Sequence, residues 1–393
     1  RFPEFSGEWE EHTLSEYLEF KNGLNPDAKR IGSGLPFISV MDILSEGVIN
    51  YDNIRGKVNA TEKEIECFGV KDGDLLFQRS SETLEDVGRA NVYMDNRTAI
   101  YGGFVIRGRK IGNYDPLFFK YLLATPLARK RTCRMGAGAQ HFNIGQEGLS
   151  KISLYFPSIE EQRKIAEFLS LIDERIATQN KIIEDLKKLK SAISKYLFAR
   201  KDLLETTICL SNIATLKNGY AFQSGKYNAL GKWKILTITN VPGERYINDE
   251  DCNCIINLPN DIQDHQVLKE GDILISLTGN VGRVSLCKNG NYLLNQRVGL
   301  LQLAKNVNQE FLYQILSSQR FENSMIACGQ GAAQMNIGKG DVENYVLPYS
   351  SNGNNILFAA KILHSYDECI INELRRLTLL TMQKQYLLTQ MFI

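Results

Sequence analysis

Side chains that hydrogen-bond well follow two short apolar segments of the sequence. Both segments are entered through a Gly-Asp turn, in VKDGDLLF at 70–77 and in LKEGDILI at 268–275. The candidates after these turns are Gln78, Arg79, Ser80 and Arg89 in the first stretch and Thr278, Asn280 and Arg283 in the second. Side chains of these types bind the edges of nucleobases or the oxygens of phosphates. The sequence alone leaves open that both stretches are ordinary solvated loops.

Two Lys-Asn-Gly turns form a second group of candidates. They contribute Lys21 and Asn22 before Gly23, and Lys217 and Asn218 before Gly219. A glycine at this place lets the backbone approach a phosphate, although an ordinary turn explains the same residues.

Two glycine-rich loops, at 136–140 and 329–334, form a third group. Their candidates are Arg134, Gln140 and Gln334. A basic helix end followed by glycines suits phosphate contact, and a simple helix C-cap accounts for it equally well. A last group, Arg107, Arg109 and Lys110 together with the run 295–297 (Asn-Gln-Arg), is also consistent with exposed strand ends.

Nothing in the sequence indicates a reaction centre. The Asn-Pro-Pro-aromatic motif of amino-methyltransferases, a glycine-rich loop for S-adenosylmethionine and a lysine-bearing phosphate loop are all missing. The four histidines lie far apart, and the one close cysteine pair, Cys252 and Cys254, lacks zinc-ribbon spacing. We therefore expect no catalytic residue, no metal site and no cofactor.

Composition points to an ordinary globular protein with more than one domain. The chain has 393 residues, of which 43% are hydrophobic and 23% charged. A net charge of +1 argues against a purely electrostatic nucleic-acid binder. Its apolar runs are too short to cross a bilayer, so we expect a cytoplasmic protein with reduced cysteines and no membrane contact.

The chain repeats itself. LSEYLEFKNG (14–23) returns as LSNIATLKNG (210–219), the two Gly-Asp segments match each other, and GAQHFNIG (138–145) returns as GAAQMNIG (331–338). The order is kept and the shift between copies changes by only a few residues. The sequence therefore predicts a tandem duplication.

A long helix is predicted after each copy. Ser158 and Glu161 form a capping box ahead of a seam of apolar residues in heptads, interrupted by Gln179 and Lys190. The C-terminal segment carries a similar seam, interrupted by Glu373 and Lys384. The two helices most simply pack on each other, although an ordinary amphipathic core helix remains an alternative for the first.

These elements predict mixed α/β globules and long helices in alternation. The expected domains are a first globule at 1–157, a central helix at 158–200, a second globule at 201–349 and a C-terminal helix at 350–393. Within the globules, strands are expected at 36–43 and 234–241, and helices at 116–131 and 309–326. The strand order does not follow from the sequence.

The whole chain resembles the specificity subunits of Type I restriction–modification systems. The resemblance rests on the opening RFPEFSGEWEEHTLSEY, the paired GDLLF and GDILI segments, the glycine loops and the junction FPSIEEQRKIAEFLSLID. In the family this junction carries a proline and then Glu-Gln, which are Pro157, Glu161 and Gln162 here. The second junction, YSSNGNNILFAAKIL after Pro348, lacks the Glu-Gln pair, so the two junctions are not expected to make identical contacts.

The resemblance implies a non-catalytic subunit. Each globule would be a target recognition domain that reads one half of a split, asymmetric site in double-stranded DNA. The helices would form an antiparallel coiled coil that sets the gap between the half-sites. Two modification methyltransferase subunits would dock on the helices and flanking surfaces, with Glu161 and Gln162 as candidate contacts, and restriction subunits would join them. The alternatives are a DNA-modifying enzyme with its own catalytic centre and a coiled-coil scaffold that does not bind DNA.

Overall fold

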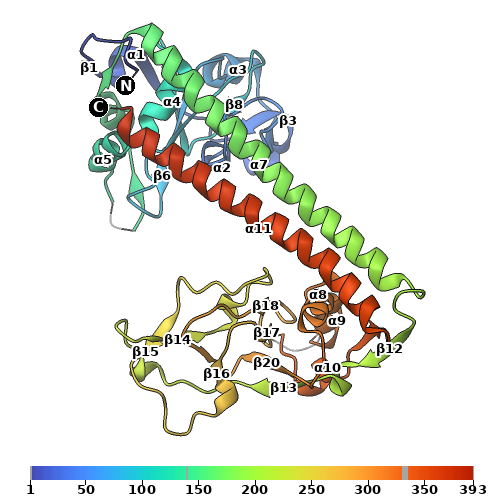
Figure 1. Cartoon of the computed structure of the whole chain (residues 1–393). Coiled ribbons are helices and arrows are strands. Elements are labelled where there is room, and N and C mark those ends of the chain that lie inside the picture. Colours follow the sequence, from blue (N-terminus) through green and yellow to red (C-terminus); the bar gives the residue numbers. More distant parts are fainter. Residues whose placement is uncertain (1, 139, 330–334, 393) are drawn as a thin grey trace. The chain divides into compact units, whose positions relative to one another are not determined.

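The structure is a computed structural model that describes residues 2–138, 140–329 and 335–392. It divides into two compact units, the first made of residues 1–180 with 376–393 and the second of residues 181–375 (Figure 1). Each unit holds one globule together with parts of two long helices, α7 (Ile159–Ala199) and α11 (Gly353–Gln390).

Both globules are built on a four-stranded antiparallel sheet with the same strand order. In the first unit the order is β2-β9-β5-β7, and in the second it is β13-β20-β17-β18. These strands are β2 (Leu18–Asn22), β5 (Leu75–Gln78), β7 (Ala90–Val92) and β9 (Val105–Lys110), and β13 (Ala214–Asn218), β17 (Ile273–Ser276), β18 (Val284–Leu286) and β20 (Val298–Leu303). The shared order confirms that the repeat in the sequence is a repeat of the fold.

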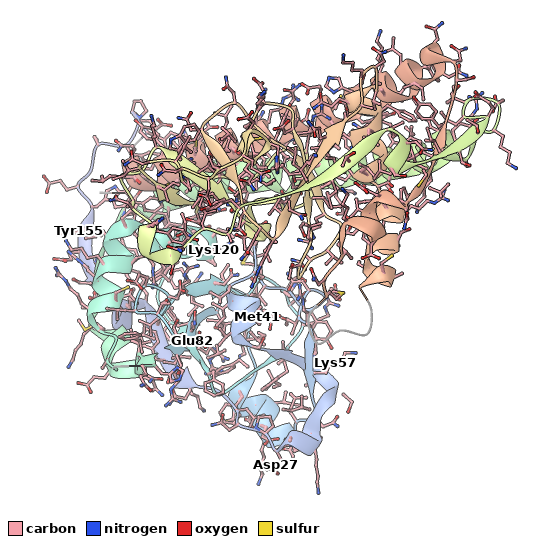
Figure 2. All side chains as sticks on the ribbon, turned by 90° about the horizontal axis from the view of Figure 1, so that it is seen from below. Asp27, Met41, Lys57, Glu82, Lys120 and Tyr155 are labelled. Carbon is pink, nitrogen blue, oxygen red and sulfur yellow. The ribbon has the colours of Figure 1, made fainter. Side chains whose placement is uncertain are left out.

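A smaller sheet lies beside each main sheet. Its strand order is β4-β3-β8 in the first unit and β15-β14-β19-β16 in the second. These strands are β3 (Ile31–Ile38), β4 (Gly56–Val58) and β8 (Ile100–Tyr101), and β14 (Trp233–Leu236), β15 (Asn253–Ile255), β16 (Val267–Leu268) and β19 (Tyr292–Leu294). In Figure 2, Asp27 and Lys57 mark the β3–β4 end of the first globule, on the side away from Tyr155.

Two-stranded ribbons and short helices complete the globules. The ribbons are β1 (Glu10–Thr13) with β11 (Ser153–Phe156), β6 (Ser80–Ser81) with β10 (Phe142–Asn143), and β12 (Thr206–Cys209) with β21 (Val346–Tyr349). The short helices are α1 (Leu14–Tyr17), α2 (Val40–Ile43), α3 (Glu62–Phe68), α6 (Gln146–Ser150) and α10 (Lys339–Glu343).

The Gly-Asp turns have the same geometry in both copies. Gly73 and Gly271 adopt positive φ angles of 81° and 87°, which favour glycine. The carboxylates of Asp74 and Asp272 then accept hydrogen bonds from the backbone N–H of the residue three positions earlier, at 2.9 and 2.8 Å. Burial raises the pKa of both carboxyl groups. These turns therefore fix where β5 and β17 begin.

Two predicted strands end earlier than the sequence suggested. The strand expected at 36–43 ends at Ile38, and the strand expected at 234–241 ends at Leu236. In both places a capping interaction starts a helical turn: Ser39 N–H donates to the Asp42 carboxylate (2.7 Å), and Thr237 N–H donates to the Asn240 amide oxygen (2.8 Å). The local side-chain bonds prevail over the β-branched composition.

Each of the two helices predicted within the globules is found as two shorter helices. The helix expected at 116–131 is α4 (Pro116–Ala124) followed by α5 (Pro126–Arg134), because Pro126 cannot continue a helix. The helix expected at 309–326 is α8 (Gln309–Leu316) followed by α9 (Gln319–Cys328). Thr125 and Ser318, both extended, cap the second helix of each pair.

The long helices are antiparallel and share the core of each globule. Asp173 of α7 meets Lys384 of α11, whereas Lys190, later on α7, meets Asp367, earlier on α11. In the first unit one apolar cluster joins Phe118, Leu169 and Leu388, and in the second a cluster joins Phe311, Leu197 and Leu363. The helices are thus part of the folding units and confirm the predicted antiparallel coiled coil.

Candidate nucleic-acid interface

In the first unit, the polar stretch after β5 is held by the neighbouring strand and by the glycine loop. Gln78 is buried and donates from Nε2 to the carbonyl oxygen of Ser80 (2.9 Å). Ser80 pairs with Asn143 across the β6–β10 ribbon, and its hydroxyl donates to the Asn143 amide oxygen. The structure therefore brings together two of the candidate groups, and Gln78 supports the loop from inside.

The second unit repeats this arrangement. Thr278 and Asn336 form an isolated antiparallel bridge, and the Thr278 hydroxyl donates to the Asn336 amide oxygen (3.2 Å). The carbonyl oxygens of Arg79 and Leu277 accept from the backbone N–H groups of Ile144 and Ile337, at 3.0 and 2.9 Å. The two polar stretches are therefore equivalent, residue for residue, at this point.

A surface hollow of about 460 Å³ marks the site in the second unit. Its lining residues are Thr278, Gln296, Arg297 and Asn336. Gln296 and Arg297 belong to the run that the sequence left as exposed strand ends. They were not among the leading candidates, because nothing in their spacing shows that the start of β20 lies beside the residues after β17. Their amide and guanidinium groups suit contacts with base edges.

Each copy has one arginine at this point, but the two arginines lie on non-equivalent strands. Arg79 faces Phe104, and Leu277 faces Arg297, as the backbone hydrogen bonds from Arg79 N–H to Phe104 O (2.9 Å) and from Leu277 N–H to Arg297 O (3.0 Å) show. Arg79 is half-buried and donates to the carbonyl oxygen of Gly103 (3.3 Å), whereas Arg297 is exposed. We call Arg79–Phe104 and Leu277–Arg297 the facing pairs.

Arg89 and Arg283 are equivalent and have local acidic partners. Their carbonyl oxygens accept from the backbone N–H groups of Gln78 and Ser276, at 2.8 and 2.9 Å. The Arg89 side chain pairs with Asp86 at 2.7 Å, and the Arg283 side chain lies 3.5 Å from Glu322. Asn280 is exposed, and its carbonyl oxygen accepts from the Ser276 hydroxyl. Both arginines sit where they can stabilise the loop.

The remaining candidates include the Lys-Asn-Gly turns, which run beside the facing pairs: Gly23 N–H donates to Val105 O (3.1 Å), and Tyr220 O, directly after Gly219, accepts from Gln296 N–H (3.0 Å). Arg134 and Gln140 are exposed near the end of α5, and Gln334 falls outside the described residues. Lys21 donates to the Cys67 thiol (2.9 Å), Lys217 is half-buried, and Asn22 and Asn218 are exposed.

The glycines of the Lys-Asn-Gly turns are needed by the protein itself. A Cβ atom on Gly23 would lie 2.1 Å from the carbonyl oxygen of Gly102, and one on Gly219 would lie 2.1 Å from that of Asn295. Both glycines therefore allow two backbone segments to approach each other, which explains their recurrence without a phosphate.

We expect Gly219→Ala to lower the free energy of unfolding by about 1–3 kcal/mol, because the added methyl group must push two backbone segments apart. Urea denaturation of the full chain measures the effect. Gly225→Ala is the matched control, since its Cβ atom would meet nothing within 4 Å. Equal losses in the two variants would contradict this explanation.

Glu161 and Gln162 are parts of the domain core. They are 1% and 3% exposed. Gln162 donates from Nε2 to the carbonyl oxygen of Pro157 (3.0 Å) and accepts from the backbone N–H of Asp115 (3.1 Å). Gln162 thus joins the start of α7 to the N-cap residue of α4, and the burial of both side chains argues against the predicted contact with a partner subunit.

Within residues 2–138, 140–329 and 335–392, no group of three or more His, Cys, Asp or Glu side chains is placed to hold a metal ion. In the same residues, none of the helices is both long and apolar enough to cross a bilayer.

Comparisons with known proteins identify the family. The model of the Type I restriction modification DNA specificity domain matches residues 6–188 and again 205–381. The chain is 24% identical to the putative type I restriction enzyme MjaX specificity subunit of Methanocaldococcus jannaschii, over 88% of this chain and 84% of the relative. It is 25% identical to the MjaVIII specificity subunit of the same organism, over 83% of this chain and 77% of the relative.

Solved structures agree in fold. The S subunit of the Type I restriction–modification system from M. genitalium matches with a TM-score of 0.59 and 17% identity, covering 98% of this chain and 96% of that one. A structure described as showing complex assembly and conformational transition of the type I R-M system matches with a TM-score of 0.58, at 13% identity and 98% and 97% coverage. Neither a modifying enzyme nor a scaffold without DNA is favoured by these likenesses. The two segments matched by the family model together cover most of the chain. The chain therefore belongs to the family of Type I restriction–modification DNA specificity subunits, which are non-catalytic.

Proposed function

We propose that the chain binds a bipartite, asymmetric site in double-stranded DNA and directs methyltransferase and restriction subunits to it. The first recognition domain is residues 1–157 and the second is residues 201–349. The helices at 158–200 and 350–393 hold them apart and set the spacer. The observation that carries this proposal is the pair of equivalent polar stretches, one in each globule, whose side chains differ.

The facing pairs supply the asymmetry. The backbone around them is the same in both copies, since the same hydrogen bonds recur. The arginine comes from β5's end in the first copy and from the start of β20 in the second. A guanidinium that reaches a guanine from a different strand contacts a different position of the groove, so two copies of one fold read two different half-sites.

Partner subunits fit the exposed apolar side chains of the long helices. On α7, in the second unit, Ile182, Leu189 and Tyr196 recur every seventh residue and are 41%, 47% and 64% exposed. On α11, in the first unit, Leu379, Met382 and Tyr386 are 63–65% exposed. Contiguous exposed apolar side chains mark interaction sites. We assign these two stripes to two methyltransferase subunits.

Restriction subunits join the methyltransferase to form the nuclease. The net charge of +1 agrees with a shared DNA clamp, in which the partners contribute much of the positive surface. The site of action is the cytoplasm, where the DNA and the partner subunits are found.

The test is sequence-specific binding by the reconstituted methyltransferase. Methylome sequencing of the host identifies the site, and competition binding then compares that site with variants in each half. Loss of affinity from changes in either half supports the proposal. Equal affinity for unrelated DNA, or methyl transfer by the specificity chain without its partners, would reject it.

Arg79 and Arg297 should determine one base each, in different half-sites. Arg79→Ala should relax discrimination at one position of the first half-site, and Arg297→Ala at one position of the second, by about 1–3 kcal/mol. Arg283→Ala should weaken binding about equally for all sequences and flatten its salt dependence, because Arg283 holds loop or backbone. The measurement is competition binding against single-base variants at two salt concentrations.

A uniform loss for the Arg79 or Arg297 variant would reassign that side chain to phosphate. Gln302→Ala is the control, since Gln302 is an exposed residue of β20 outside the hollow. It should leave both affinity and specificity unchanged.

A further inference from the structure

The long helices contain two charged interruptions of their apolar seam at equivalent places. Lys190 on α7 and Lys384 on α11 are 194 residues apart in the sequence, and so are Asp173 on α7 and Asp367 on α11. In the first unit Lys384 lies 2.5 Å from Asp173, and in the second unit Lys190 lies 2.6 Å from Asp367. Each copy of the duplication therefore supplies one aspartate and one lysine.

The second ion pair is mostly buried, and the first is half-buried. The side chains of Lys190 and Asp367 are 19% and 7% exposed, and those of Lys384 and Asp173 are 29% and 20% exposed. A charge at such a position is strongly unfavourable when its partner is taken away. Each ion pair therefore requires one particular residue of α7 to lie opposite one particular residue of α11.

Each aspartate also binds the globule of its own copy. The Tyr121 hydroxyl on α4 donates to Asp173 (2.8 Å), and the Gln314 amide on α8 donates to Asp367 (2.6 Å). Tyr121 and Gln314 are themselves equivalent, since each lies six residues after the N-cap of its helix, Asp115 or Asn308. One carboxylate therefore joins the recognition domain, its own long helix and the long helix of the other copy. We call Tyr121–Asp173–Lys384 and Gln314–Asp367–Lys190 the two clasps.

The second clasp has additional support. Arg245, 8% exposed, donates to Asp367 at 2.9 Å and to Glu310 of α8 at 2.7 Å. Glu310 is also 3.6 Å from His364 on α11. The loop before β15 is in this way attached to α8 and to α11 by one guanidinium.

We propose that Asp173 and Asp367 are positioning residues, which lock the register of the two long helices and the seating of each recognition domain in a single arrangement and so fix the length of the DNA spacer. Sliding α11 by one heptad would place Lys190 against Ala360, which is 2% exposed, and would leave Asp367 without its lysine. A single buried polar contact in a coiled coil is enough to select one register. The two clasps provide two such contacts. Through the hydrogen bonds of Tyr121 and Gln314, each clasp also fixes the position of one globule on the helices.

The inference rests on the proposed function, because it concerns the spacer of the bipartite site. Its test replaces both lysines, as Lys190→Met/Lys384→Met, in the full chain assembled with methyltransferase subunits. Methyl transfer is measured on DNA that carries both half-sites with spacers from two base pairs shorter to two longer than the natural one. We expect the ratio of off-length to natural-length methylation to rise by about tenfold, with base discrimination within each half-site unchanged.

Lys188→Met is the matched control. Lys188 lies on the same helix, is 67% exposed and pairs within α7, with Glu184 at 2.5 Å. Its spacer profile should equal that of the unmodified chain. Thermal unfolding of all variants separates loss of stability from loss of register. Lowered stability with an unchanged spacer profile would make the clasps simple structural contacts and would overturn the proposal.

A charge exchange provides the second arm. Asp173→Lys alone sets two lysines against each other, and Asp173→Lys/Lys384→Asp restores opposite charges. The single variant should broaden the spacer profile. The double variant, which restores the ion pair but not the carboxylate beside Tyr121, should narrow it again in part. Absence of rescue would also overturn the proposal. If the unmodified complex shows no selection for any bipartite site, the proposed function itself has failed; if it selects one spacer and every variant does so equally sharply, only this inference has failed.

Discussion

Insertion of four residues into both long helices, after Thr178 and after the equivalent Asn372, should lengthen the preferred DNA spacer by about two base pairs. Four helical residues add about 6 Å, and each base-pair step of DNA spans about 3.4 Å. The insertion also turns the parts beyond it by roughly 40° about the helix axis. Because Asp173 and Lys384 stay in one unit and Lys190 and Asp367 in the other, both clasps survive.

The same insertion in α7 alone should behave differently. The two helices are then unequal between the clasps, so only one clasp can form without a bulge, and the insertion adds a stutter to the heptad seam. We expect lost binding or a spacer profile without a clear maximum. Methylation of a spacer library measures both variants. An unchanged natural spacer in the matched variant would show that the helices do not set the distance.

Exchange of residues 1–157 for the corresponding region of another family member should change one half of the target and leave the other half intact. Each globule has its own core and its own polar stretch, so the exchange leaves the second recognition domain unchanged. Methylome sequencing of cells that carry the exchanged chain gives the new site directly. Simultaneous change in both halves would reject the model of two independent readers.

The exchanged region has one structural requirement. It must supply a side chain that donates a hydrogen bond at the position of Tyr121, since Asp173 otherwise loses its contact with the recognition domain and keeps the ion pair with Lys384. An exchanged region with tyrosine or glutamine at this position should give a hybrid site with the natural spacer. An exchanged region with an aliphatic residue there should still give a hybrid site, but with a broader spacer profile.

The duplication and the long helices could be predicted because they are local or periodic signals. Repeated segments and heptads are visible along the chain, and the fold class follows from them. The strand order could not be predicted, since it depends on which distant segments pair, and the pairing of β2 with β9 across more than 80 residues leaves no local pattern. The capping turns at Ser39 and Thr237 were missed because composition favoured strands there.

The candidate site stays a prediction, and its geometry could not be deduced from the sequence. The polar stretches after β5 and β17 were singled out by residue type, whereas the burial of Gln78 and the position of Arg297 beside Thr278 depend on cross-strand neighbours. Glu161 and Gln162 show the same limit, because the burial of their side chains cannot be deduced from the motif. Lys190 and Lys384 were visible only as exceptions to the seam, and their aspartate partners appear only when the helices are paired.

The facing pairs have a consequence for how new specificities can arise in evolution. Neighbouring strands lie about 4.8 Å apart, which exceeds one base-pair step. We propose that transfer of an arginine from one member of a facing pair to the other, as between Arg79–Phe104 and Leu277–Arg297, moves the guanidinium to the neighbouring strand while the backbone stays fixed. Under the proposed function, two point substitutions would then change the base that a recognition domain contacts, without recombination and without loss of its core.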